Sequence, residues 1–392
     1  MNMRLLILAA DFKPSLGGIA EYTHQMALHL QQMGDDVLVL ARPAPGDVAF
    51  DAGCPYAVQR ALLHPSQKPP FIARVRQLGA VASSFGADLI LANAPLSEPL
   101  AGRAVAWRHR LPFAIVVYGQ ELYNYVSLRD LPPLVRFKKQ LVTTVSLRRA
   151  DLVIAISRFT RSLLQELGVK IDGIAIIPPA VDPDALHAQL AQARAKKVTL
   201  PLPAEHPILL TVSRLVERKG IDVTLQALPA VIEKVPDVRY VIVGAGPDRA
   251  RLERQVAEQE LTEHVRFAGR VSDAEKVLYY DAADVFVMPN RTLPNEDVEG
   301  FGIVFLEANA FGKPVIAGRS GGAVDAVVDG VTGLLVDPQD ARKVSQAILA
   351  LLRDSDYAER LGRQGKRRVE EELTWVKSAH KLRHRLTSLI SQ

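Results

Sequence analysis

The chain has 392 residues, 48% apolar and 23% charged, which is enough for two folded cores and typical of an ordinary globular enzyme. Its single cysteine, Cys54, excludes an intrachain disulfide or a cysteine-rich metal site, and no run of about 18 apolar residues is present to span a membrane. The net charge of +5 is uneven: residues 101–150 carry nine basic and two acidic side chains, so this segment predicts an anionic partner.

Short apolar segments alternate with segments of helical periodicity along the chain. Strands are expected near 4–10, 36–41, 88–92, 113–117, 152–156, 174–177, 207–212, 239–243, 265–268, 284–288, 314–317 and 333–336. Helices are expected near 18–33, 71–85, 97–109, 133–149, 157–168, 220–234, 247–260, 272–281, 302–311, 322–329 and 339–352. This alternation predicts two α/β domains, each with a doubly wound parallel sheet.

The expected domains are residues 1–190 and 191–372, both Rossmann-like, with a C-terminal helix in 373–392 that packs back toward the first domain. Residues 182–207 are polar and end in three closely spaced prolines, so they are interpreted as the linker. Ligands of such sheets bind beyond the carboxyl ends of the strands, which predicts a site in a cleft between the domains.

The stretch after the strand near 284–288 has the features of an anion site. Gly300 and Gly302 leave the first amides of the following helix uncovered, and a phosphate fits against such amides. Glu299 stands at the helix entrance and Glu307 lies eight residues later, so one could contact the sugar end of a ligand and the other a ribose. A capped helix with two solvated glutamates is the alternative.

Two other loops point the same way. Arg214 and Lys219 flank the tight loop "SRLVERKG" after the first strand of the second half, where two cations would neutralise a diphosphate or simply be solvated. Gly17 and Gly18 open a helix after the first strand of the first half, again leaving amides bare.

The segment "VIVGAGPDRARL" contains Gly244-x-Gly246 between a strand and a helix but lacks the third small residue of a dinucleotide fingerprint. Arg270, at the end of the next strand, could pair with an NADP 2′-phosphate. An NADP-dependent oxidoreductase is therefore a competing hypothesis, although it leaves the paired glutamates and the two cations without a role.

Taken together, these segments resemble a retaining glycosyltransferase of the GT-B fold, in the large family numbered four. Glu299-x7-Glu307, Arg214 with Lys219, and Gly17-Gly18 match the family's motifs, and "GAGPDRARL", "FAGRV" and "SGGAVDAVVDGVTGLLVDP" occur in family order. The sequence is most similar to GDP-mannose-dependent mannosyltransferases that modify phosphatidylinositol mannosides. UDP-sugar enzymes share the same loop.

The resemblance implies that the first domain holds the acceptor and the second the nucleotide-sugar donor. It implies catalytic roles for Glu299, Arg214 and Lys219, with Glu299 on sugar hydroxyls, Glu307 on the ribose and the base near Arg270 and Val271. The full set of expected donor-binding residues is Gly17, Gly18, Arg214, Lys219, Gly244, Arg270, Val271, Glu299, Phe301, Gly302, Ile303 and Glu307.

The acceptor loop departs from the family pattern, which often has histidine there. The segment reads "AIVVYGQELYNY", with Tyr118 and Gln120 at the histidine positions and Glu121 retained. Asp11, Tyr118, Gln120 and Glu121 are the expected acceptor-binding residues. Neither tyrosine nor glutamine is a good base at neutral pH, so the departing phosphate or Glu121 would take the acceptor proton.

The expected partners are a nucleotide sugar and a glycan or lipid-linked acceptor. No metal or other cofactor is expected, since cations and amides can stabilise the leaving phosphate and the Asp-x-Asp strings at Asp182 and Asp354 lie away from the site. A cytoplasmic location is expected, with residues 101–150 attracted to the inner face of an anionic membrane, and no nucleic-acid partner. A non-catalytic protein that binds nucleotide sugars is a further alternative.

Overall fold

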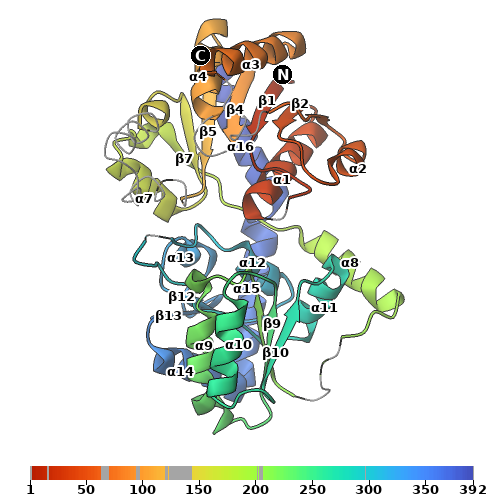
Figure 1. Cartoon of the computed structure of the whole chain (residues 1–392), viewed down its shortest axis with the longest axis vertical. Coiled ribbons are helices and arrows are strands. Elements are labelled where there is room, and N and C mark those ends of the chain that lie inside the picture. Colours follow the sequence, from red (N-terminus) through yellow and green to blue (C-terminus); the bar gives the residue numbers. More distant parts are fainter. Residues whose placement is uncertain are drawn as a thin grey trace. The chain divides into compact units, whose positions relative to one another are not determined.

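The computed structural model describes residues 2–15, 17–62, 70–93, 98–119, 122, 144–200, 202, 206–295 and 297–391, and the chain forms two compact units (Figure 1). The first unit consists of Met1–Pro179 and Trp375–Gln392, and the second of Ala180–Thr374. The chain therefore changes unit at Pro179, eleven residues before the boundary expected at 190, and returns to the first unit at Trp375.

The first unit is built on a parallel seven-stranded sheet with strand order β3-β2-β1-β4-β5-β6-β7. Its strands are β1 (Arg4–Ala9), β2 (Asp36–Ala41), β3 (Ala57–Gln59), β4 (Leu89–Asn93), β5 (Phe113–Val117), β6 (Leu152–Ala155) and β7 (Ile174–Ile176). Its helices include α1 (Gly18–Gln32), α2 (Asp47–Ala52), α3 (Phe71–Phe85), α4 (Glu98–His109), α7 (Arg158–Glu166), the 3-10 turn η3 (Ile171–Gly173) and α16 (Trp375–Ile390), and residues 144–148 are also helical. Strands β4, β5 and β6 are buried at every residue, as parallel strands covered on both faces are.

The second unit repeats this plan with a parallel six-stranded sheet of order β10-β9-β8-β11-β12-β13. Its strands are β8 (Ile208–Val212), β9 (Arg239–Val243), β10 (Val265–Gly269), β11 (Val285–Met288), β12 (Val315–Gly318) and β13 (Gly333–Val336). Its helices are α8 (Pro183–Ala195), η4 (Glu217–Lys219), α9 (Ile221–Ile232), α10 (Arg249–Glu258), α11 (Asp273–Ala282), α12 (Ile303–Ala310), α13 (Ala323–Ala326), α14 (Ala341–Arg353) and α15 (Ser355–Glu372).

The linker predicted over 182–207 is wrong for its first half, which forms α8. Asp182 caps this helix by accepting a hydrogen bond from the Ala185 amide at 3.0 Å, and a proline fits its first turn. Leu186 and Leu190 are buried because α8 packs against α11 of the same unit. The polar composition marks the outer face of a surface helix.

Each sheet has one point where the strand order reverses. In the second unit β8 and β11 are neighbours, and the chain proceeds from β8 to β10 on one side and from β11 to β13 on the other. The loops after β8 and β11 therefore diverge at the carboxyl end of the sheet, and ligands bind at such a point in open α/β sheets. The corresponding neighbours in the first unit are β1 and β4.

Candidate active site

The loops that follow β8 and β11 touch at this point of strand reversal in the second unit. The first loop, residues 213–220, contains η4 and leads into α9, and the second, residues 289–302, leads into α12. They meet at Gly220, where φ is +72° and an added Cβ would lie 2.0 Å from the Pro289 carbonyl oxygen. Only glycine allows both the backbone conformation and this close approach.

One side chain from each loop forms the central ion pair. Lys219 Nζ donates to Glu299 Oε2 at 2.5 Å, and the two side chains are 10% and 13% exposed. Burial acts to raise the pKa of Glu299, but the charges of Lys219 and Arg218, with hydrogen bonds from Lys219 and the Phe301 amide, hold this pKa below its usual value. Glu299 is thus an ionised acceptor for hydroxyl groups, next to a cation that can bind phosphate.

Arg218 joins this pair, and the sequence analysis missed it. Its Nη1 donates to Asp297 at 3.1 Å, and its Nε lies 4.0 Å from Glu299 Oε2. That Nε is buried and has no hydrogen-bond partner among the described residues. A buried donor left unpaired costs free energy, and an anionic ligand beside Glu299 would satisfy it. The "ERK" of the loop supplied two adjacent cations, but only the fold shows that both face Glu299.

Arg214, expected to act with Lys219, lies on the same loop but is exposed. Its guanidinium makes no hydrogen bond or ion pair with the part of the chain that the structure describes. The neighbouring Ser213 hydroxyl is buried and is likewise without a hydrogen-bond partner among those residues. The start of the loop therefore presents a donor and a cation that remain available to a ligand.

The entrance to α12 has the open backbone that the glycines predicted. Gly302 is the N-cap residue with φ of +93°, and no side chain caps the helix there. An added Cβ at Gly302 would lie 2.6 Å from the ring of Phe305. Phe301 is buried, while Ile303 begins the helix with an amide that lacks a partner within it.

Glu307 lies further along α12 and is held by α11 rather than by Lys219. It accepts from Lys276 Nζ at 3.0 Å and from the Tyr280 hydroxyl at 2.7 Å. Burial, then the charge of Glu307 and the hydrogen bond to it, raise the pKa of Tyr280 well above 10.0. Tyr280 therefore remains a neutral donor that fixes the Glu307 carboxylate.

The glycines of the Gly244-x-Gly246 segment have a structural explanation. Gly244 has φ of +135°, and an added Cβ would lie 1.8 Å from the Ser213 carbonyl oxygen. A Cβ at Gly246 would lie 2.1 Å from the Leu215 carbonyl oxygen. The loop after β9 thus packs against the loop after β8, and no dinucleotide is needed to explain its glycines. Arg270, just after β10, is exposed, and Val271 is half-buried.

Among the residues expected in the first unit, Asp11 and Tyr118 closely follow the carboxyl ends of β1 and β5. Gly17, the N-cap of α1, is exposed with φ of +152°, and Gly18 begins the helix. Asp11 is half-buried; burial raises its pKa, an effect that the charge of Arg42 opposes.

Tyr118 is buried, and its hydroxyl donates to the amide oxygen of Asn93 at the end of β4. Gln120 and Glu121 lie outside the described residues, as does most of the basic helix expected at 133–149. The structure thus joins Lys219, Glu299 and Arg218 in one cluster, holds Glu307 on α12 through Lys276 and Tyr280, and places Asp11 and Tyr118 in the first unit.

Asp182 and Asp354, the first residues of the two Asp-x-Asp strings, each cap a helix with the side chain. Within the described ranges, no group of three or more His, Cys, Asp or Glu residues could hold a metal ion. None of the helices described there is both long and apolar enough to cross a membrane.

Comparison with known proteins assigns the chain to a family. The profile described as Glycosyltransferase Family 4 matches residues 16–185, and that described as Glycosyl transferases group 1 matches residues 192–368. A GDP-mannose-dependent alpha-(1-6)-phosphatidylinositol monomannoside mannosyltransferase of Mycolicibacterium smegmatis is 34% identical over 384 residues, covering 95% of each chain.

The chain belongs to glycosyltransferase family 4. An enzyme of the same description from Mycobacterium tuberculosis (strain H37Rv) is 35% identical to this family 4 chain, and the match covers 97% of each of the two chains. Among solved structures, Anabaena Alr3699/HepE in complex with UDP and glucose matches with a TM-score of 0.78 and 21% identity, covering 99% of this chain and 100% of that one. This likeness confirms the α/β GT-B fold, and the family establishes a glycosyltransferase.

Proposed function

We propose that this glycosyltransferase moves mannose from GDP-mannose to a hydroxyl of a lipid-linked mannoside, with retention of the anomeric configuration and without a metal ion. The observation that carries the proposal is 34% identity to a GDP-mannose-dependent enzyme across 95% of both chains. The cluster of Lys219, Arg218 and Glu299 supports it, because it supplies the charges that such a donor needs.

The donor pyrophosphate binds among the cations and bare amides. Lys219 and Arg218, with Arg214 at the loop entrance, neutralise the phosphates, and the amides of Gly302 and Ile303 donate to them. These groups stabilise the negative charge that grows on the leaving phosphate, which is the task of a divalent ion in other transferases.

The two glutamates hold the two ends of the donor. Glu299 is ionised and accepts hydrogen bonds from hydroxyls of the sugar, while Glu307 accepts from the ribose diol beside Lys276. The base lies against Arg270 and Val271. A mannose held at Glu299 places its anomeric carbon next to the phosphates bound by Lys219.

Transfer breaks the bond between the anomeric carbon and the phosphate oxygen and forms one to the acceptor oxygen on the same face. The departing phosphate takes the acceptor proton, so no side chain need act as base. This agrees with the acceptor loop, where Tyr118 is buried and hydrogen-bonded. Asp11 orients the acceptor, together with Gln120 and Glu121, which follow Tyr118 in the sequence.

The acceptor is carried by a lipid, and the enzyme works as a peripheral protein at the cytoplasmic face of a membrane. The basic segment 101–150 supports this, since each Lys or Arg near an anionic surface adds about 1 kcal/mol of attraction. Flotation with vesicles of increasing anionic lipid content measures it directly.

The deciding experiment supplies GDP-mannose, UDP-glucose or ADP-glucose with phosphatidylinositol monomannoside in mixed micelles and looks for a product heavier by one hexose. GDP-mannose is expected to be used, with unchanged yield in EDTA and with the α configuration kept by NMR. Glu299→Gln is expected to lose transfer by about 100-fold while staying folded. The control, Glu263→Gln, changes an exposed carboxyl just before the amino end of β10, away from the carboxyl ends of the strands, and is expected to behave as wild type. Transfer from UDP-glucose alone, or full activity in Glu299→Gln, contradicts the proposal.

A further inference from the structure

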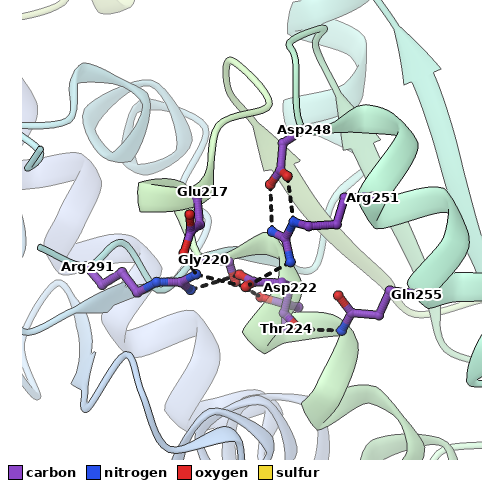
Figure 2. A network of polar contacts seen from close by, with 8 residues as sticks. All are labelled: Glu217, Gly220, Asp222, Thr224, Asp248, Arg251, Gln255 and Arg291. Atoms are coloured by element: carbon purple, nitrogen blue, oxygen red, sulfur yellow. Dashed lines mark hydrogen bonds and ion pairs between the residues drawn. The ribbon is translucent and has the colours of Figure 1, made fainter. Parts of the chain in front are cut away.

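Three residues after Lys219 in the chain stands Asp222, the centre of a second charged cluster that the chemistry above does not use. Asp222 is the second residue of α9 and is 8% exposed. Its two carboxylate oxygens each accept a hydrogen bond from Arg291 at 2.8 Å, and one lies 3.4 Å from Arg251 (Figure 2). Such a two-point contact between a carboxylate and a guanidinium fixes orientation as well as distance.

Arg291 connects the loop after β11 to the whole length of η4. Its backbone amide donates to the Arg218 carbonyl oxygen at 2.8 Å. Its guanidinium reaches Glu217 at 3.3 Å, in addition to Asp222. Arg291 therefore contacts the chain on both sides of Lys219, at Arg218 and at Asp222. Arg291 itself belongs to the loop that carries Glu299.

The loop after β9 is tied into the same cluster. Arg251 of α10 donates to both oxygens of Asp248, at 2.6 and 2.7 Å, and its remaining bond goes to Asp222. Gln255 of α10 donates to the Asp222 carbonyl oxygen at 2.8 Å. Figure 2 shows the Asp222 carboxylate between the guanidinium groups of Arg291 and Arg251. Three loops at the carboxyl end of one sheet are thereby braced together.

The Asp222 carboxyl stays ionised within this cluster. Burial acts to raise the pKa of Asp222, but hydrogen bonds and charge from Arg291 and Arg251 hold it below its usual value. Removing one partner would leave the other as a buried charge without compensation, which is strongly destabilising.

We propose that the Asp222–Arg291 pair is a positioning device for the transfer reaction: it fixes the loop bearing Arg218 and Lys219 against the loop bearing Glu299, so that the cations and the carboxylate are preorganised before the donor binds. This rests on the proposed function for its catalytic consequence. Neither residue is expected to touch the donor. Their effect comes through the alignment of Lys219 and Glu299, and a misplacement of about 1 Å in such a site costs about 100-fold in rate.

The test compares Arg291→Met, Asp222→Asn and the double variant with wild type below their unfolding temperatures. For release of GDP from GDP-mannose with phosphatidylinositol monomannoside, each single variant is expected to lose kcat by about 10- to 100-fold with little change in the donor KM. The double variant is expected to recover stability, because both charges are gone, but to lose no more kcat than the singles, since the brace is already broken.

Arg291→Lys keeps the charge but cannot contact both oxygens in one plane, so its kcat is expected between wild type and Arg291→Met. It also serves if Arg291→Met does not fold. The matched control is Arg363→Met, which removes an exposed pair with Glu359 on α15. A tenfold rise in KM at constant kcat, additive losses in the double variant, or wild-type turnover in Arg291→Lys each overturn the proposal.

A second readout needs no substrate. Hydrogen exchange of peptides covering 213–223 and 289–302 in the ligand-free protein is expected to accelerate about tenfold in Arg291→Met and not in the Arg363→Met control. Unchanged exchange overturns the inference whatever the enzyme's donor proves to be. If Arg291→Met exchanges faster but the wild-type enzyme uses none of the three donors tested, the positioning role of the Asp222–Arg291 pair is supported and the proposed function is rejected. Failure of the inference can therefore be told apart from failure of the proposed function.

Discussion

At the residue scale, Glu299 is an ionised carboxyl only because Lys219 and Arg218 are beside it. Burial acts against its charge, and the two cations together with the Phe301 amide more than offset that effect. A carboxyl whose pKa is lowered by folding contributes stability above its unfolded pKa, and loses it as pH falls through the folded value. In the wild type this stability is therefore present at neutral pH and lost only below about pH 4.5.

Replacing Lys219 by Met should reverse the sign of this dependence. With its main partner gone, burial dominates and the pKa of Glu299 rises, so the protein binds a proton more readily when folded than when unfolded. We expect a loss of about 3 kcal/mol at pH 8 that shrinks as pH is lowered toward 5. Urea unfolding at several pH values measures it, with Lys219→Met/Glu299→Gln as the control that removes both charges. A loss of equal size at every pH contradicts this account.

At the element scale, the start of α12 depends on one backbone conformation. Gly302 has φ of +93° and the Phe305 ring occupies the space where a Cβ would be, so alanine there faces both strain and a clash. Gly312, just past the other end of the helix, has φ of +69° with nothing within 4 Å of its Cβ position. Alanine variants at these two positions therefore distinguish the effect of backbone strain, which both have, from the effect of a changed helix entrance, which only the variant at Gly302 has.

We expect Gly312→Ala to lose about 1–2 kcal/mol of stability, the cost of a left-handed conformation for a residue with a side chain, and Gly302→Ala to lose more because of its additional clash with Phe305. Only Gly302→Ala should also lose affinity for GDP, because its clash turns the first amides of α12 away from the phosphate. Calorimetric titration with GDP after confirmation of folding makes the comparison. Equal GDP affinity in both variants shows that the entrance amides do not bind the nucleotide.

Elements with strong periodicity were predictable from the sequence, whereas contacts between loops were not. Strands β2, β5 and β9 lie at the expected residues because continuous buried runs leave few alternatives. The three-residue edge strand β3 was missed because it has too few residues for a pattern. Helix α8 was taken for a linker, although Leu186, Leu190 and Ala193 were a readable apolar stripe.

The candidate site shows the same division. Motif spacing marks the paired glutamates and Lys219 as candidates but not Arg218, since nothing local shows that both adjacent cations lie beside Glu299. The Asp222–Arg291 pair spans 69 residues of sequence and joins the start of α9 to the loop after β11, so no periodicity or motif connects its members. Residue type and spacing in the sequence point to groups that could face a ligand, whereas charge pairs between distant residues can be recognised only from the three-dimensional structure.

At the scale of the whole molecule, the first unit is completed by the last helix of the chain. α16 returns after the entire second unit has been made and packs along α1 (Figure 1). Arg383 of α16 donates to both oxygens of Asp35, at 2.8 and 3.1 Å, across 348 residues of sequence. The Asp35 side chain is fully buried and also accepts from the Met3 amide next to β1. This ion pair therefore attaches α16 to the residues that immediately precede β1 and β2.

Arg383→Met should lower the stability of the first unit and leave nucleotide binding by the second unit unchanged. The change leaves the Asp35 carboxylate buried with only a backbone donor in place of a cation, and breaking a buried pair in this way costs about 3 kcal/mol. GDP affinity should remain as in wild type, because the cluster around Lys219 lies in the other unit. Arg385→Met, an exposed position on the same helix, is the control and should change neither quantity. Chemical unfolding with and without GDP measures both. If Arg383→Met is as stable as wild type, Arg383 does not hold α16 in place. Weaker GDP binding in a variant that is still folded contradicts the expectation that this change leaves the donor site unaffected.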